Sequence, residues 1–288
     1  MHKTTEPLIL ITNDDGIASP GLQAAVRAAL PLGEVLVAAP AEQWSGAGRS
    51  MPHNVSGRIS RYPLEVDGQP VTAYQIDASP ALAVGRALLV LTPRRPALLI
   101  SGINYGENMG ADVTSSGTVG AALQGAISGI PALAVSLQTP KETHTNPSDD
   151  VDFAAAVHFA RIFAGWMLRV TFPFDVDVLK VDIPAEATPQ TPWRLTRVSR
   201  HTYFVGVPPK QTGAQGTSAS PIAGEAGEDI HIQVHYQQLP HPERTETDSD
   251  IYALAVERVV SVAPLSLDLT SRSDLAEVEA LLCGPAAL

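Results

Sequence analysis

The chain has 288 residues, which is enough to bury a substantial core as one large domain or two small ones. Its hydrophobic fraction of 44% and charged fraction of 17% are typical of a soluble globular protein. Lysine and arginine total 19 against 30 aspartate and glutamate residues, and the net charge of -11 argues against a general nucleic-acid-binding surface. An anionic ligand would need a local positive field, from a divalent cation or from clustered main-chain N–H groups.

Cysteine content and apolar runs indicate the compartment. Cys283 is the only cysteine, which excludes an intrachain disulfide framework and a thiolate metal cluster. The apolar run at residues 8–11 is too short for a secretory signal, and the apolar stretch 81–100 is interrupted by three arginines. We therefore expect a cytoplasmic protein that neither spans nor binds a membrane.

Through the first two thirds of the chain, short apolar runs alternate with alanine-rich stretches, and Gly and Pro residues mark their boundaries. Strands that alternate with helices predict parallel βαβ units. The expected fold is therefore α/β, with a doubly wound, mostly parallel sheet covered on both faces. Strands are expected at residues 8–12, 34–38, 97–101, 132–137 and 177–183, and helices at residues 21–30, 80–91, 118–128 and 150–168.

After Trp193 the pattern changes to strands separated by long connections, with no helix expected before residues 273–282. This pattern predicts a core of residues 1–192 and an extension of residues 193–288, made of β-hairpins and a carboxy-terminal helix. Because small hairpins are marginally stable alone, we expect them to pack on a partner subunit in a homo-oligomer. The expected strands are 195–200, 202–207, 229–236 and 259–262, and the expected polar loops are 211–227 and 238–250.

Two adjacent carboxylates, Asp14 and Asp15, directly follow the first expected strand. Ligands of open α/β sheets gather outside the carboxyl ends of the strands, and a bound cation would offset the repulsion between two neighbouring carboxylates. The alternative is a turn in which Asn13 or Asp15 caps the helix that begins near Pro20. The residues of this segment alone leave both interpretations open.

Two further loops follow expected strands and add oxygen donors. Ser45 lies in a glycine-rich loop after the second strand, and Asn104 lies in the loop after the third. Together with Asp14 and Asp15 they form an all-oxygen set, which hard cations such as Mg²⁺, Mn²⁺ or Ca²⁺ prefer. With only two carboxylates, water and substrate oxygens would complete the coordination shell, which suits catalysis.

A third loop leads into a helix through Ser116, Gly117 and Thr118. The unpaired N–H groups and positive end of a helix N-terminus form a cradle for phosphate. Ser and Thr are also the commonest N-caps, so simple helix capping is the alternative. The glycine spacing fits neither a dinucleotide-binding fingerprint nor a Walker A loop.

Four ordered segments together resemble the survival protein SurE family of 5′/3′-nucleotidases, which are metal-dependent nucleoside-monophosphate phosphatases. The segments are Asn13-Asp14-Asp15-Gly16 with Pro20-Gly21; Ala39-Pro40 with Ser45-Gly46 and Gly48; Ser101-Gly102-Ile103-Asn104 with Gly106 and Asn108; and Ser116-Gly117-Thr118-Val119 with Gly129-Ile130-Pro131-Ala132. Their ordered occurrence is far more specific than any one of them.

The resemblance implies roles for individual residues and a fold. It implies a Rossmann-like core that oligomerises through its carboxy-terminal arms, as a homodimer or a dimer of dimers, with one divalent cation per subunit. Asp14, Asp15, Ser45 and Asn104 would hold the cation, and Asn108, Ser116, Gly117 and Thr118 would bind the phosphate.

The chain also departs from the family's pattern. Gln124 replaces an expected glutamate, Arg49 stands where histidine or asparagine is frequent, Asp182 replaces the usual asparagine, and Arg258-Val259 replaces Gly-Tyr. None of these positions is a proposed ligand. The departures leave the substrate preference and the geometry of the arms open.

We expect hydrolysis of nucleoside 5′- and 3′-monophosphates to nucleoside and phosphate, with Asp14, Asp15 and Asn108 as the catalytic residues. Direct attack by water is favoured over an aspartyl-phosphate on Asp14, because a carboxylate engaged with metal is a poor nucleophile. Two alternatives are a haloacid-dehalogenase-like phosphatase, which requires Asp-x-Asp rather than adjacent carboxylates, and a non-catalytic nucleotide- or phosphate-binding module. An assay with added Mn²⁺ separates catalysis from binding alone.

Overall fold

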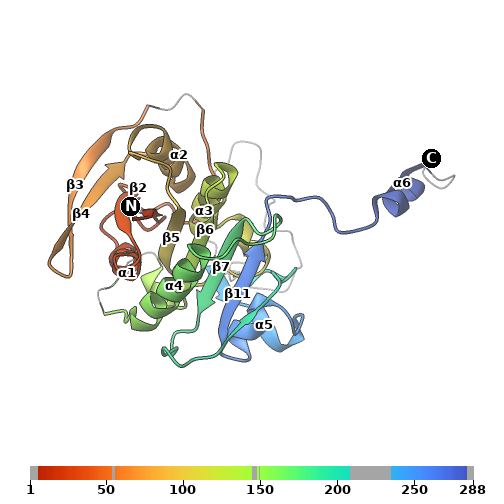
Figure 1. Cartoon of the computed structure of the whole chain (residues 1–288). Coiled ribbons are helices and arrows are strands. Elements are labelled where there is room, and N and C mark those ends of the chain that lie inside the picture. Colours follow the sequence, from red (N-terminus) through yellow and green to blue (C-terminus); the bar gives the residue numbers. More distant parts are fainter. Residues whose placement is uncertain (1–5, 54–55, 145–147, 149, 208–234, 284–288) are drawn as a thin grey trace, which may run out of the picture.

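The computed structural model describes residues 6–53, 56–144, 148, 150–207 and 235–283. Within these residues a nine-stranded sheet runs in the order β3-β4-β2-β1-β5-β6-β7-β11-β8, and a separate antiparallel pair is formed by β9 and β10 (Figure 1). From β4 to β7 along this order, each strand runs parallel to the next, whereas the pairs β3–β4 and β7–β11 are antiparallel. The α/β class and the mostly parallel sheet are confirmed.

The five central strands and four long helices predicted from the sequence are all present, with boundaries that shift by a few residues. The strands are β1 (Leu8–Thr12), β2 (Glu34–Pro40), β5 (Leu98–Tyr105), β6 (Ala132–Leu137) and β7 (Val178–Ile183). The helices are α1 (Pro20–Ala29), α2 (Pro80–Val90), α3 (Gly117–Ile127) and α4 (Ala154–Met167).

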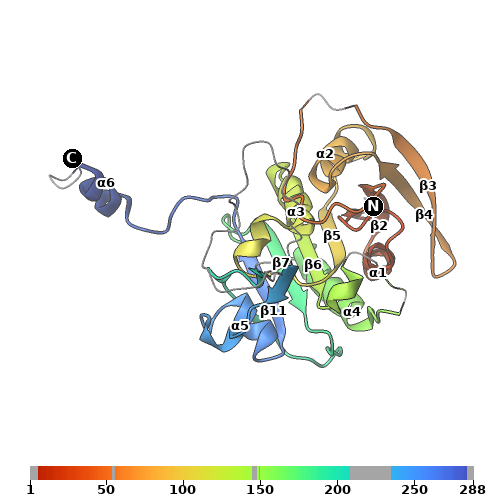
Figure 2. The ribbon, with the colours of Figure 1, turned by 180° about the vertical axis from the view of Figure 1, so that it is seen from behind.

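Side chains of the central strands alternate between two apolar layers, which makes the sheet doubly wound. On β1, Ile9 and Ile11 join a cluster with buried residues of α1 and α4, whereas Leu8 and Leu10 join a cluster with residues of α2 and α3. This alternation follows from the two-residue period of a strand. The two helix pairs therefore cover opposite faces of the sheet (Figures 1 and 2).

The strand order reverses at β1, which has β2 on one side and β5 on the other. In doubly wound folds the crevice at such a switch point, outside the carboxyl ends of the strands, is where ligands bind. Asp14 lies in the loop that follows β1, and Asn104 lies near the carboxyl end of β5, so the fold brings two of the predicted ligands to this crevice.

A hairpin of β3 (Ile59–Val66) and β4 (Gln69–Ile76) extends the sheet beyond β2 and was not expected from the sequence. Its prolines and half-exposed polar residues obscure the apolar period, as is usual in edge strands. The turn between the strands does carry a recognisable signal. Asp67 and Gly68 both have positive φ, 53° and 77°, which is the requirement that makes Asp-Gly typical of a two-residue hairpin turn.

The carboxy-terminal strands divide between the main sheet and the separate pair. β11 (Val260–Leu265) runs antiparallel to β7, and β8 (Trp193–Leu195) pairs with β11, so both extend the main sheet. β9 (Phe204–Val207) and β10 (His235–Gln238) form the antiparallel pair. The expected strand 229–236 lies among the described residues only at its end, and the expected loop 211–227 lies outside them.

The expectation of no helix before residues 273–282 is wrong, because α5 (Asp250–Ala255) follows the polar segment 238–250. Ser249 caps α5 by accepting a hydrogen bond from the main-chain N–H of Tyr252, a cap signal that the polar composition of the segment hides. Short 3-10 turns occur as η1 (Ala111–Thr114), η2 (Lys141–Thr143) and η3 (Pro242–Arg244).

The predicted terminal helix is present as α6 (Leu275–Cys283), which stands apart from the body at the end of an extended segment (Figures 1 and 2). All of its described residues are exposed. In the part of the chain that the structure describes, no helix has both the length and the hydropathy needed to cross a bilayer.

Candidate metal and phosphate site

Asp14 lies against the N-terminus of α3, where two residues accommodate its carboxylate. The Thr118 hydroxyl donates a hydrogen bond to Asp14 Oδ1 at 2.5 Å. Gly117 has no side chain, and a Cβ at this position would lie 2.6 Å from Asp14 Oδ2. The positive end of the helix therefore faces a carboxylate of the protein itself, which the glycine allows to approach closely.

Asp15 is held by two partners, one from the loop after β2 and one from the end of β5. Its Oδ1 accepts a hydrogen bond from the Gln43 side-chain amide at 3.0 Å, and its Oδ2 accepts one from the main-chain N–H of Tyr105 at 3.2 Å. The interpretation of Asn13 or Asp15 as a helix cap is wrong, because Ser19 is the N-cap of α1. Asn13 instead donates to the carbonyl of Gly16 at 3.0 Å and closes the turn after β1.

The two carboxylates carry an electrostatic cost in the absence of a cation. Burial raises the pKa of Asp14 to about 6, although the hydrogen bond from Thr118 opposes this shift. Burial, and then the charge of Asp14, raise the pKa of Asp15 to about 7. A positive charge at this place would stabilise both ionised forms.

The donor set fits a hard divalent cation. Asn104 donates its amide nitrogen to the carbonyl of Gly106 at 2.7 Å, which leaves the amide oxygen available as a ligand, and Ser45 is exposed. Among the described residues there is no group of three or more His, Cys, Asp or Glu side chains that could hold a metal ion. Two carboxylates with an amide and a hydroxyl oxygen match Mg²⁺, Mn²⁺ or Ca²⁺ with water or substrate in the open positions.

A cavity of about 450 Å³ opens at this site. It joins three of the four predicted metal ligands (Asp14, Ser45 and Asn104) with two of the predicted phosphate ligands (Asn108 and Ser116). The other described residues that line it are Gly46, Tyr105, Gly106, Glu107, Asp112, Ser115, Lys141, His144, Phe204 and Tyr236. This lining does not include Asp15, Gly117 or Thr118. Gly117 and Thr118 contact the Asp14 side chain, and Asp15 is its neighbour in the chain.

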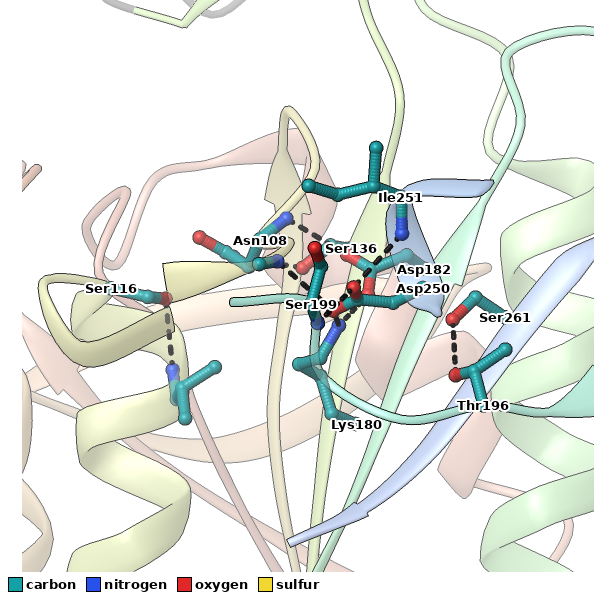
Figure 3. A network of polar contacts seen from close by, with 12 residues as sticks. Asn108, Ser116, Ser136, Lys180, Asp182, Thr196, Ser199, Asp250, Ile251 and Ser261 are labelled. Carbon is teal, nitrogen blue, oxygen red and sulfur yellow. Dashed lines mark hydrogen bonds and ion pairs between the residues drawn. The ribbon is translucent and has the colours of Figure 1, made fainter. Parts of the chain in front are cut away.

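Asn108 and Ser116 are both held by local contacts. The side-chain amide of Asn108 donates to Ser136 Oγ at 2.9 Å, and its main-chain N–H donates to Asp182 Oδ1 at 2.8 Å (Figure 3). Ser116 is the N-cap of α3, and its Oγ accepts a hydrogen bond from the main-chain N–H of Val119 at 3.1 Å. The capping interpretation is therefore confirmed, and the Ser116 O–H remains able to donate to a ligand.

Aromatic and basic residues at the cavity were not singled out from the sequence. Phe204 of β9 packs edge to face on His144, with ring centroids 6.0 Å apart, and Tyr236 of β10 and Lys141 of η2 lie on the same cavity. Asp112 accepts hydrogen bonds from the main-chain N–H groups of Tyr203 and Phe204 at 2.8 and 2.9 Å, which anchors the start of β9 there. These residues come from distant segments, so no local motif joins them.

The fold and the site together define a class: a Rossmann-like α/β protein with carboxylates and a helix N-terminus at the topological switch point, suited to a cation and a phosphate. The survival protein SurE family model matches residues 9–205. The chain belongs to this family, which confirms the resemblance seen in the sequence.

Similar proteins match over nearly the whole chain. The 5′-nucleotidase SurE of Thermococcus gammatolerans is 38% identical over 276 residues, covering 96% of each chain. The 5′-nucleotidase SurE of Methanocella arvoryzae is 38% identical over 278 residues, covering 95% of this chain and 97% of its own. The crystal structure of the SurE protein from Aquifex aeolicus superposes with a TM-score of 0.73 at 27% identity, covering 96% of this chain and 99% of its own.

Proposed function

We propose that this protein is a divalent-metal-dependent phosphomonoesterase that hydrolyses nucleoside 5′- and 3′-monophosphates to nucleoside and phosphate. The observation that supports the proposal is a cavity whose lining includes residues predicted to bind metal, residues predicted to bind phosphate, and aromatic side chains. Membership of the SurE family and the 5′-nucleotidase names of full-length relatives support it.

The chain's own residues would bind the cation and orient the phosphate. Asp14, Asp15, Ser45 and Asn104 would hold one Mg²⁺, Mn²⁺ or Ca²⁺ per subunit, which when bound would neutralise phosphoryl charge and lower the pKa of a bound water. Asn108 has a second amide hydrogen beyond the one that it donates to Ser136, and this hydrogen is available to a phosphoryl oxygen. Ser116 would donate its hydroxyl to the same group, and Gly117 and Thr118 would complete the phosphate cradle with their main-chain N–H groups. The Thr118 hydroxyl holds Asp14 beside this cradle.

Direct attack by water is favoured by the contacts of Asp14. Its Oδ1 accepts the Thr118 hydroxyl, and its Oδ2 lies in the space that only a glycine at position 117 leaves open. A carboxylate that accepts the Thr118 hydroxyl and would also hold the cation is a poor nucleophile toward phosphorus. We expect no acid-stable phosphoenzyme when the protein is quenched during turnover, whereas trapping of one on Asp14 would establish the aspartyl-phosphate route.

The aromatic part of the cavity suits the nucleoside. Phe204 and Tyr236 line the cavity, and stacking on aromatic rings holds nucleobases with little preference among them. A volume of about 450 Å³ is in the range of cavities that take small-molecule ligands. The substrate would then lie with its phosphate at Asn108 and Ser116 and its base toward β9 and β10.

Assembly is the last part of the proposal. The exposed α6 at the end of its extended segment would pack on a second subunit, giving a homodimer or a dimer of dimers. The single cysteine supports a reducing, cytoplasmic location.

The proposal is tested by phosphate release from nucleoside 5′- and 3′-monophosphates with Mg²⁺, Mn²⁺ or Ca²⁺, each with a matched chelator control. We expect metal-dependent release from both ester types. Binding of nucleotides without release under every metal would favour the non-catalytic module. Release in the presence of excess chelator would contradict the metal assignment.

A further inference from the structure

A lysine is buried between two aspartates beside the loop that carries Asn108. Lys180 and Asp182 lie two residues apart on β7 and therefore share one face of the strand. The Lys180 ammonium contacts Asp182 Oδ2 and lies 3.1 Å from Asp250 Oδ2 (Figure 3). All three side chains are fully buried.

Both carboxylates also bind the main chain of the Asn108 loop. Asp182 Oδ1 accepts the N–H of Asn108 at 2.8 Å, and Asp250 Oδ2 accepts the N–H of Gly110 at 3.0 Å. Asp250 further accepts the N–H of Ser199 at 2.9 Å, so the cluster joins the loop after β5 to the carboxy-terminal part of the chain. Two points of the loop, two residues apart, are thereby fixed to buried charges.

The side chain of Asn108 is fixed from the neighbouring strand. Ser136 on β6 is the register partner of Asp182 on β7, and its Oγ accepts the Asn108 amide at 2.9 Å. Adjacent positions of two strands therefore hold Asn108: the Asp182 side chain binds its main-chain N–H, and the Ser136 hydroxyl binds its side-chain amide (Figure 3).

This arrangement is not what stability alone favours. Burying an ion cluster is often no better for folding than apolar residues of the same volume, because desolvation offsets the attraction between the charges. The Asp182 carboxylate accepts the main-chain N–H of Asn108, and the Lys180 ammonium balances the negative charge of that carboxylate. The cluster therefore fits a role in fixing the loop.

We propose that Asp182 and Ser136 are positioning residues for Asn108, with Lys180 balancing the charge of Asp182. Neither residue touches the substrate; both act by keeping the Asn108 amide directed at the phosphate. The inference rests on the proposed function, because the role of Asn108 at the phosphate is part of it.

A double-mutant cycle tests the proposal. Asp182→Ala, Asn108→Ala and the double variant are compared for kcat, KM and inhibition by inorganic phosphate, in the holoenzyme with saturating metal. We expect Asp182→Ala to lower kcat about 10- to 100-fold, since misplacement by about 1 Å has effects of this size. In the Asn108→Ala background the same change should cost less than about 2-fold, because the residue through which Asp182 acts is gone.

Three further variants control the cycle. Ser261→Ala removes a hydrogen bond to Thr196 of 2.8 Å beside Asp182 without contacting Asn108, and should change kcat less than about 2-fold. Asp182→Asn keeps an oxygen acceptor for the Asn108 N–H and should retain kcat within about 3-fold. Ser136→Ala changes no charge and replaces Asp182→Ala in the cycle if that variant does not fold.

The outcomes are distinct. If Asp182→Ala costs the same factor with and without Asn108, its role is structural and the positioning proposal is overturned while the proposed function stands. If Asn108→Ala itself turns over like wild type, the phosphate assignment within the proposed function fails. Non-additive losses, with retention of activity by Asp182→Asn and Ser261→Ala, support the positioning role.

Discussion

At the scale of single residues, the most consequential feature is a pair of buried carboxylates whose ionisation is unfavourable without a cation. The pKa values of Asp14 and Asp15 rise from 3.8 to about 6 and about 7. The folded-state pKa values lie above the unfolded ones. In the metal-free protein, the contribution of these two carboxyl groups to stability is therefore fully present below about pH 4 and is lost as pH rises through 6 and 7.

Asp15→Asn should therefore stabilise the metal-free protein while impairing catalysis. In chelator at pH 8 we expect its unfolding free energy to exceed that of wild type by about 1 kcal/mol or more, roughly 2–4 °C in Tm, with the difference vanishing toward pH 4. Activity with metal should fall about 10- to 100-fold. Thermal melts at both pH values measure the effect.

The matched control is Glu42→Gln, which removes one negative charge from an exposed position near the same loop. It should show no such pH-dependent gain. An Asp15→Asn variant that is less stable than wild type at pH 8 would contradict the electrostatic account of the pair.

Arg258 shows how a departure from the family pattern is accommodated. It adopts a left-handed conformation, with φ of 56°, where the family's motif has glycine. Its guanidinium pairs with Glu186, with Nε 2.6 Å from Oε1, and donates to Gln138 at 2.8 Å. These contacts offset a backbone cost of about 1–2 kcal/mol that glycine would not carry.

Replacing Arg258 by Ala or by Gly separates the two effects. Both variants lose the ion pair, but only alanine keeps the backbone strain, so Arg258→Gly should be more stable than Arg258→Ala by about 1 kcal/mol. Chemical denaturation of both variants measures the difference. Equal stabilities would show that the left-handed backbone at this position carries no cost.

Several residue roles could be predicted from local sequence, and others could not. Asp14 and Asn104 lie on strand ends, and the parallel sheet brings strand ends together. That Thr118 donates to Asp14 depends on how α3 packs against the end of β1, which the segment 116–118 does not encode. Phe204 and Tyr236 are likewise brought to the cavity only by the pairing of β9 with β10.

At the scale of secondary-structure elements, the N-terminus of α3 is the element proposed to join metal and phosphate binding. Gly117→Ala should raise helix propensity, yet its Cβ would lie 2.6 Å from Asp14 Oδ2 and force the carboxylate to move. We expect the metal concentration for half-maximal activity to rise about tenfold. A metal titration of activity measures it.

Gly85→Ala in α2 is the matched control, because its Cβ would meet nothing closer than 3.7 Å. It should leave the metal titration unchanged and stabilise the fold by about 0.5–1 kcal/mol. If Gly117→Ala behaved in the same way, the close approach of Asp14 to α3 would not matter for metal binding.

The β9–β10 pair is the element proposed to bind the base. Phe204→Ala should raise KM for nucleoside monophosphates about tenfold, since loss of base stacking on an aromatic ring costs about 1–3 kcal/mol. KM for a phosphomonoester that lacks a nucleobase, such as glycerol phosphate, should change little. Steady-state kinetics on both substrates tests the division, and an equal rise for both would argue against base recognition at Phe204.

The elements also show where sequence patterns are reliable. The five central strands are apolar on both faces, and the four helices bury alanine-rich stripes, so their periods are clear. The edge hairpin of β3 and β4 has half-exposed residues and little apolar repeat, and α5, although largely buried, is only six residues long. For these, the Asp67-Gly68 turn and the Ser249 cap are the signals that remain, and both are only a few residues long.

At the scale of the whole molecule, the carboxy-terminal arm is the part that the body does not cover. On α6, Leu275, Val278, Leu281 and Leu282 recur at helical spacing, with exposed fractions between 38% and 73%. Leu269 in the preceding segment is 93% exposed. An apolar stripe of this kind, held away from its own core (Figure 2), favours packing on another subunit.

Leu281→Glu should disrupt the proposed assembly. The substitution keeps a good helix former but places a charge in the apolar stripe, where each buried leucine contributes about 1.5–3 kcal/mol. We expect light scattering at micromolar concentration to give a multiple of the chain mass for wild type and a smaller assembly for the variant. Ala280→Glu adds the same charge on the opposite side of α6 and should leave the mass unchanged. A monomeric wild type would contradict the proposed oligomer, and an unchanged Leu281→Glu assembly would place the interface away from α6.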